Sequence, residues 1–201
     1  MLRITDVVKH LLIINIVLYI VTATIMPDAR GVLGLAYPTS PHFQPFQLVT
    51  HMFMHADTNH LFMNMLGLFF FGPALEMHFG PKRFLFYYLF TGFGAMILQL
   101  LMNYIEIHYF GGSPAGLWGA SGSIFGLLAG FAMINPNQVI RMIFPPIAMK
   151  AKYFVLIFAA IELYSGVCGA NTGVAHFAHL GGALFGILII LYWRNQRGRA
   201  R

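Results

Sequence analysis

The sequence predicts an all-α integral membrane protein, a bundle of six transmembrane helices in which a short fourth helix starts mid-membrane. Of the 201 residues, 58% are hydrophobic and only 9% are charged, whereas soluble domains carry about a quarter charged residues. Six apolar segments are separated by glycines, prolines and basic residues, and five of them approach the length of a bilayer crossing. We expect a single membrane domain over residues 1–201.

The expected spans, in chain order, are residues 7–26, 59–76, 84–105, 121–134, 152–168 and 174–193. No small-residue cleavage pattern follows the first span, so we expect it to be a retained anchor. Residues 27–58 contain four prolines and many apolar side chains. They are too broken to cross the bilayer, and we expect them to lie on the outer rim of the bundle.

The lysines and arginines predict the orientation. If both termini are cytoplasmic, only Arg30 of the 12 basic residues lies outside, as the positive-inside rule requires. The formal charge of +6 is scattered between apolar segments and the C-terminal tail, which argues against nucleic acid as a partner. We expect a multi-pass protein of a bacterial inner membrane whose environment is the lipid bilayer. The oligomeric state stays open.

The fourth segment begins at Gly119-Ala120-Ser121-Gly122 and ends before the breaker Asn135-Pro136. At ~1.5 Å per residue it spans ~20 Å, against a hydrocarbon core of ~30 Å, so Ser121 lies ~10 Å below the outer surface. The glycine-rich residues 111–116 ahead of it cannot be helical. They must enter the membrane as a loop lined by protein or water, because bare backbone in lipid is too costly.

Two further polar side chains fall near the depth of Ser121. His179 in the sixth span comes out ~8 Å deep, and His60 near the outer end of the second span is slightly shallower. Serine and histidine are the residues needed for acyl transfer, in which an imidazole takes the hydroxyl proton. We therefore predict Ser121 as nucleophile and His179 as general base.

No acid is expected near His179. Asp57 lies at the rim, Glu76 at the cytoplasmic end of its helix and Glu162 mid-helix on the fifth span. The sequence thus predicts a Ser–His dyad without a carboxylate. Phe125, one turn after Ser121, is expected to stack on the imidazole instead.

Small residues and hydrogen-bond donors complete the predicted site. Gly122, Gly126 and Gly130 form one stripe, and Gly182 and Gly186 form another beside His179. Such stripes let membrane helices pack backbone to backbone. His60 and Asn64 share a helix face, and with the Ser121 N–H they can donate to an oxyanion.

Each of these signals has an ordinary structural explanation. Glycine stripes usually serve packing, and a histidine–asparagine pair is more often an interhelical hydrogen-bond partner. A histidine-ligated metal or haem site is a further alternative, built from His51, His55, His60, His176 and His179. It lacks thiolate or carboxylate ligands and leaves Ser121 unexplained, so we expect no metal and no cofactor.

Three ordered motifs resemble those of the rhomboid intramembrane serine proteases. They are His60-x-x-x-Asn64, Gly119-Ala120-Ser121-Gly122 and Ala178-His179-x-x-Gly182-x-x-x-Gly186. The resemblance implies a Ser121–His179 dyad, an oxyanion hole of His60, Asn64 and the Ser121 N–H, and supporting roles for Gly119, Phe125, Gly182 and Gly186.

The resemblance also implies the substrate class, which is single-span membrane proteins cut near the outer side of the membrane. The aromatic–arginine pair often seen in the first loop reads Phe46-Gln47 here. A non-proteolytic adaptor or chaperone, which some members of that family have become, is the nearest alternative function.

Overall fold

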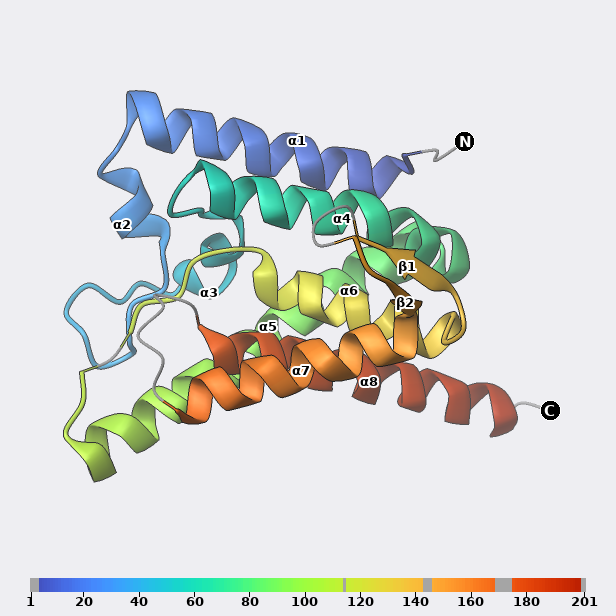
Figure 1. Ribbon diagram of the computed structural model, residues 1–201. Coiled ribbons are helices and arrows are strands. Elements are labelled where there is room, and N and C mark those ends of the chain that lie inside the picture. The colour runs from blue at the N-terminus through green and yellow to red at the C-terminus, as the bar shows by residue number, and fades with distance from the viewer. Residues whose placement is uncertain (1–3, 114, 143–145, 169–174, 200–201) are drawn as a thin grey trace.

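The computed structural model describes residues 4–113, 115–142, 146–168 and 175–199, and these are mostly helical (Figure 1). The elements in chain order are α1 (Asp6–Ile20) with a π-helical turn (Val21–Ile25), α2 (Ala29–Leu33), α3 (Gln47–Thr50) with a 3₁₀ turn (His51–Phe53), α4 (Thr58–Phe79), α5 (Pro81–Phe110), α6 (Ser121–Ile134), β1 (Val139–Arg141), β2 (Ala148–Lys150), α7 (Ala151–Val167) and α8 (His176–Arg199).

Helices form at all six places where the sequence predicts a span. Among the described residues, three helical stretches are long and apolar enough to cross a membrane: Asp6–Ile25, Pro81–Phe110 and His176–Gln196. The shorter apolar helix α6 begins at Ser121, as predicted. Three predictions concern residues outside the described part of the chain. They are the start of the sixth span at Val174, Pro114 in the glycine-rich loop and Arg201 in the C-terminal tail.

The mostly helical structure agrees with the predicted all-α class, and one connection adds a pair of short strands that was not predicted. Between α6 and α7, β1 and β2 pair antiparallel, with Val139 opposite Lys150 and Arg141 opposite Ala148. Each strand has only three residues. Strands this short carry too little alternation of apolar and polar residues to be recognised in a sequence.

Helix α6 lies inside the bundle and packs against α4, α5, α7 and α8. Nine of its 14 residues are buried, on all sides of the helix. A helix that is apolar all round needs such surroundings. Figure 1 shows α6 in yellow with α4, α7 and α8 around it.

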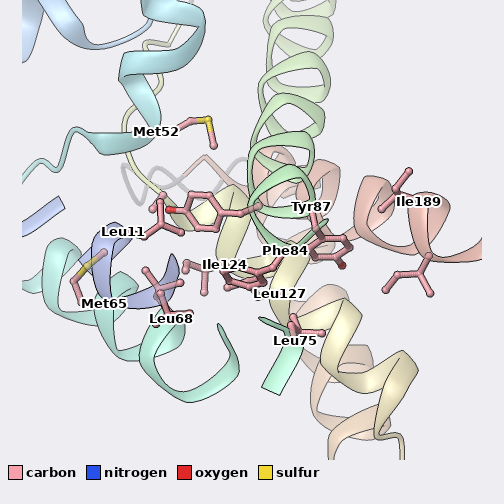
Figure 2. Packing of buried hydrophobic residues seen from close by; sticks show 14 of the residues in the cluster. Leu11, Met52, Met65, Leu68, Leu75, Phe84, Tyr87, Ile124, Leu127 and Ile189 are labelled. Carbon is pink, nitrogen blue, oxygen red and sulfur yellow. The ribbon is translucent and has the colours of Figure 1, made fainter. Parts of the chain in front are cut away.

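The main apolar core joins α1, α4, α5, α6 and α8. Figure 2 shows the rings of Phe84 and Tyr87 from α5 in the same cluster as Leu75 of α4 and Leu127 of α6. All four side chains are fully buried. At the cytoplasmic end predicted from sequence, Glu76 accepts hydrogen bonds from the N–H groups of Val7 and Val8 and so caps α1.

The two ends of the bundle differ in what they carry. In Figure 1 the start of α1, the end of α8 and the β1–β2 hairpin lie at one end, whereas α2 and α3 lie at the opposite end. The start of α1 and the end of α8 therefore share one side of the bundle, which agrees with the predicted arrangement of both helices across a membrane.

The first loop, residues 26–57, is organised around the buried amide of Gln47. Its Nε2 donates to the carbonyls of Val32 and His42 at 2.9 and 3.0 Å. Its Oε1 accepts from the N–H groups of Ala36 and Gln44 at 3.1 and 3.2 Å. The departure from the usual aromatic–arginine pair therefore leaves the loop anchored, because Gln47 bonds four backbone groups.

Candidate active site

Ser121 is the first residue of α6, and the backbone just before it has an unusual conformation at Gly119. Gly119 has φ +118°, which a residue with a side chain rarely adopts. Its N–H donates to the carbonyl of His51 at 2.8 Å. The first N–H groups of α6 have no carbonyl within the helix to bond. The positive end of the helix dipole at this point favours an anion beside Ser121.

The glycine-rich loop ahead of Ser121 is fixed by polar contacts with its neighbours. Buried Asn103 of α5 donates to the carbonyl of Ala115 at 2.8 Å and accepts from Gln99. Leu117 forms a two-way backbone bridge with Leu35 of the first loop. The carbonyl of Ala115 and both backbone groups of Leu117 are thus bonded by protein, which is what irregular backbone inside a membrane needs.

His179 of α8 lies against Ser121. Its Nε2 is 2.8 Å from Ser121 Oγ, a hydrogen-bond distance. Phe125 covers the face of the imidazole, with ring centroids 4.2 Å apart and planes 6° apart. The stacking expected from the one-turn spacing of Ser121 and Phe125 is therefore present.

The close contact of Ser121 and His179 depends on glycine packing between α6 and α8. A Cβ added to Gly182 would overlap the carbonyl of Gly122, and one added to Gly186 would lie 3.1 Å from the carbonyl of Gly126. No larger residue fits at Gly182 unless the helices move apart. Gly182 and Gly186 therefore face the backbone of Gly122 and Gly126, whereas the α6 stripe itself faces α5, where Cβ atoms on its glycines would meet Ala95, Thr91 and Tyr87.

His60 and Asn64 of α4 lie next to Gly119, two residues before the start of α6. A Cβ on Gly119 would lie 2.7 Å from His60 Nε2 and 3.7 Å from Asn64 Nδ2. Asn64 Nδ2 is buried and, among the described residues, has no hydrogen-bond partner. His60 Nδ1 accepts from the Ala56 N–H at 3.4 Å, so Nε2 carries the proton and can donate.

The expectation that no carboxylate lies near His179 is wrong. Glu162 of α7 has its Oε2 3.1 Å from His179 Nδ1 and 2.6 Å from His176 Nδ1. His176 therefore shares this carboxylate oxygen with His179. The carboxylate is nearly buried, with 13% of its side chain exposed.

Two histidines of the first loop are buried near the site. Burial lowers the pKa of His51 to about 4, although its bond to the carbonyl of Gln47 opposes the shift. Burial also lowers the pKa of His55 to about 4, assisted by neighbouring His60. Within the described part of the chain, no three His, Cys, Asp or Glu side chains are grouped to hold a metal ion.

Comparison with known families gives the same assignment as the motifs. The family model of the rhomboid domain matches residues 42–196, which include every residue of the site. The chain belongs to the rhomboid family.

Relatives of this rhomboid come from several kinds of organism. It is 31% identical over 151 residues to rhomboid protease AarA of Providencia stuartii, which covers 69% of this chain and 52% of AarA. It is 30% identical over 190 residues to the chloroplastic rhomboid-like protein 11 of Arabidopsis thaliana, covering 90% and 62%. Rhomboid-like protease 3 of Toxoplasma gondii is 27% identical over 192 residues, covering 90% and 67%. The chain thus spans about half to two thirds of these relatives.

Proposed function

We propose that this rhomboid is an intramembrane serine endopeptidase that cleaves transmembrane-helix substrates with Ser121 as nucleophile and His179 as general base. The observation that supports this most directly is the 2.8 Å separation of Ser121 Oγ and His179 Nε2. Two relatives that are named proteases, AarA and rhomboid-like protease 3, support the same class of activity.

The geometry is suited to acyl transfer in two steps. Ser121 Oγ attacks the peptide carbonyl carbon as Nε2 takes the hydroxyl proton, and the imidazolium then protonates the departing amine nitrogen. The C–N bond breaks and an acyl-enzyme remains. Water attacks this ester as Nε2 takes one of its protons, and the imidazolium then protonates Ser121 Oγ as the ester C–O bond breaks, which releases the carboxylic acid product and regenerates Ser121.

The negative oxygen of each tetrahedral intermediate needs donors in fixed positions. The Ser121 N–H at the start of α6 and the side chains of His60 and Asn64 supply them in this proposal. The buried Asn64 Nδ2 without a described partner supports this role, since an unbonded buried donor is costly in a folded protein. Such preorganised donors act mainly in the transition state.

The substrate class follows from where the site lies. Peptide bonds in a transmembrane helix hide their carbonyls in hydrogen bonds, so cleavage requires a locally unwound segment. Single-span membrane proteins with a helix-destabilised stretch near the outer side are the substrates we propose. The basic residues support a multi-pass arrangement with both termini cytoplasmic, and we assign the protein to a bacterial inner membrane.

The purified protein in detergent should cleave a single-span reporter that carries a glycine-containing, destabilised transmembrane segment. It should also be labelled on Ser121 by a fluorescent serine-directed phosphonate. The Ser121→Ala variant should insert into membranes and unfold at a similar temperature but neither cleave nor label. A chelator should not change the wild-type rate.

Two outcomes would contradict the proposal. Cleavage by purified Ser121→Ala would show that another residue is the nucleophile. A folded wild-type protein that binds the reporter without cleaving it or reacting with phosphonate would indicate the adaptor function instead.

A further inference from the structure

The third helix to reach the Ser121–His179 pair is α7, through the side chain of Glu162. One carboxylate oxygen, Oε2, lies 2.6 Å from His176 Nδ1 and 3.1 Å from His179 Nδ1. The two imidazoles are successive members of one face of α8. Glu162 thus lies between two rings, and only the ring of His179 contacts Ser121.

The protonation of His179 requires an acceptor at this position. A neutral imidazole that takes a proton at Nε2 must carry its own proton on Nδ1. That Nδ1 is buried and has no aligned hydrogen bond in the described structure. Glu162 Oε2, at 3.1 Å, is close enough for an ion pair but not aligned as a hydrogen bond. Catalytic hydrogen bonds are often poorly aligned without substrate and tighten when it binds.

We propose that Glu162 is a positioning residue for His179, holding the imidazole with its proton on Nδ1 and stabilising the imidazolium that forms as Ser121 attacks. This inference rests on the proposed proteolytic function. It replaces the expected dyad with a chain of three groups, Glu162, His179 and Ser121. His176 does not touch the reacting atoms in this scheme, and it anchors the carboxylate from the other side.

A purely structural role for Glu162 makes different predictions. Carboxylates within membrane helices are expensive and occur where partners or function retain them. If Glu162 served only to bind His176 and hold α7 on α8, its loss would lower stability and leave His179 unaffected in the folded molecules. The two roles are therefore separated by readouts on His179 itself.

The first experiment measures kcat and KM for reporter cleavage by Glu162→Gln, which keeps the shape of the side chain and removes its charge. We expect kcat to fall by about 10- to 100-fold with KM little changed. This fall should be smaller than for a histidine with no other support, because Phe125 still stacks on the ring. Glu162→Asp should recover part of the loss. The matched control is Glu106→Gln, an exposed acid at the far end of α5, which should keep the wild-type rate.

The second experiment does not depend on cleavage. Proton NMR of the histidine-labelled protein in detergent should show a downfield Nδ1–H resonance, assigned to His179 by its absence in His179→Ala. The resonance should disappear in Glu162→Gln and persist in Glu106→Gln and Ser121→Ala. If Glu162→Gln does not fold, the same signal in Glu162→Asp should weaken or shift.

Failure of this inference differs from failure of the proposed function. Wild-type kcat in folded Glu162→Gln with an unchanged His179 resonance would overturn the role of Glu162 alone. A loss of rate that matches the lost folded fraction, again with the resonance intact, would also overturn it. A wild-type protein that never cleaves would refute the protease proposal, and the resonance would still test the Glu162–His179 contact.

Discussion

The two helices that flank α6 on the side of the site, α8 and α7, are packed in opposite ways. Helix α8 meets α6 through glycines whose missing Cβ atoms bring backbone against backbone. Of α7, only Ala151 and Phe154 are buried, whereas Leu156, Tyr164 and Val167 are between 66% and 71% exposed. The nucleophile and base thus lie at a tightly packed contact between two helices, whereas Glu162 comes from a helix with few buried residues.

The largest effect should come from removing the base on the tightly packed side. His179→Ala should abolish both reporter cleavage and phosphonate labelling of Ser121, because no other described group lies at hydrogen-bond distance from the serine hydroxyl. His176→Ala should leave labelling largely intact and should lower the cleavage rate less than Glu162→Gln does. The reverse pattern would show that His176 is the base and that the assignment of the two rings is wrong.

The next effect tests whether the α6–α8 contact itself is required. Gly182→Ala places a methyl group against the Gly122 carbonyl, so the helices must separate. We expect cleavage to fall about 100-fold or more, since misplacing reacting groups by about 1 Å costs that much. Gly31→Ala is the control, because a Cβ there meets nothing within 4 Å. A wild-type rate in Gly182→Ala would mean that this contact tolerates movement.

A smaller loss is expected from the donors that α4 contributes. Asn64→Ala should lower kcat about 10- to 1,000-fold with little change in KM, and towards the low end because His60 and the Ser121 N–H share the charge. Steady-state kinetics on the reporter measure this. Unchanged kcat with a lower unfolding temperature would instead make Asn64 a packing residue.

The smallest effect concerns stability in the first loop rather than catalysis. His51 and His55 have folded-state pKa values of about 4, below the unfolded value of 6.5. The unfolded chain therefore binds more protons as pH falls from 6.5 to 4, and the folded state loses stability across that window. At pH 5 the loss is on the order of 1–2 kcal/mol per ring.

Thermal unfolding in detergent at pH 7.5 and pH 5 checks this pH dependence. His51→Gln and His55→Gln should each reduce the difference between the two pH values, whatever they do to overall stability. An exposed histidine provides the control, and His10→Gln on α1 should leave the difference unchanged. An equal pH dependence in all three variants would show that the buried rings do not cause it.

Much of the bundle could be predicted because it depends on local features. Apolar segments of limited length, the breaker after Ile134 and the glycine spacing each act within one helix, so α6 was expected to begin at Ser121 and does. The role of Gln47 could not be predicted, because its four partners come from separate turns of an irregular loop. No periodicity links them.

The position of Glu162 near His179 could have been predicted from its depth in the membrane. It lies six residues before Cys168, or ~9 Å from the outer end of its helix, which matches the ~8 Å depth of His179. A position mid-helix does not exclude an acid from the site, because an acid inside a membrane helix is a functional candidate. Depth in the membrane does not give the rotation of α7 about its own axis, which decides whether Glu162 faces α8. Only tertiary packing determines that rotation.

The contacts of the buried Gln47 amide limit which side chains can replace it. An amide offers both a donor and an acceptor, and here each is used twice, the donor on two carbonyls and the acceptor on two N–H groups. A guanidinium has donors only. An arginine at this position would leave the N–H groups of Ala36 and Gln44 without their acceptor. The loop that supports Gly119 through His51 is therefore matched to glutamine, and Gln47→Arg is not a neutral change.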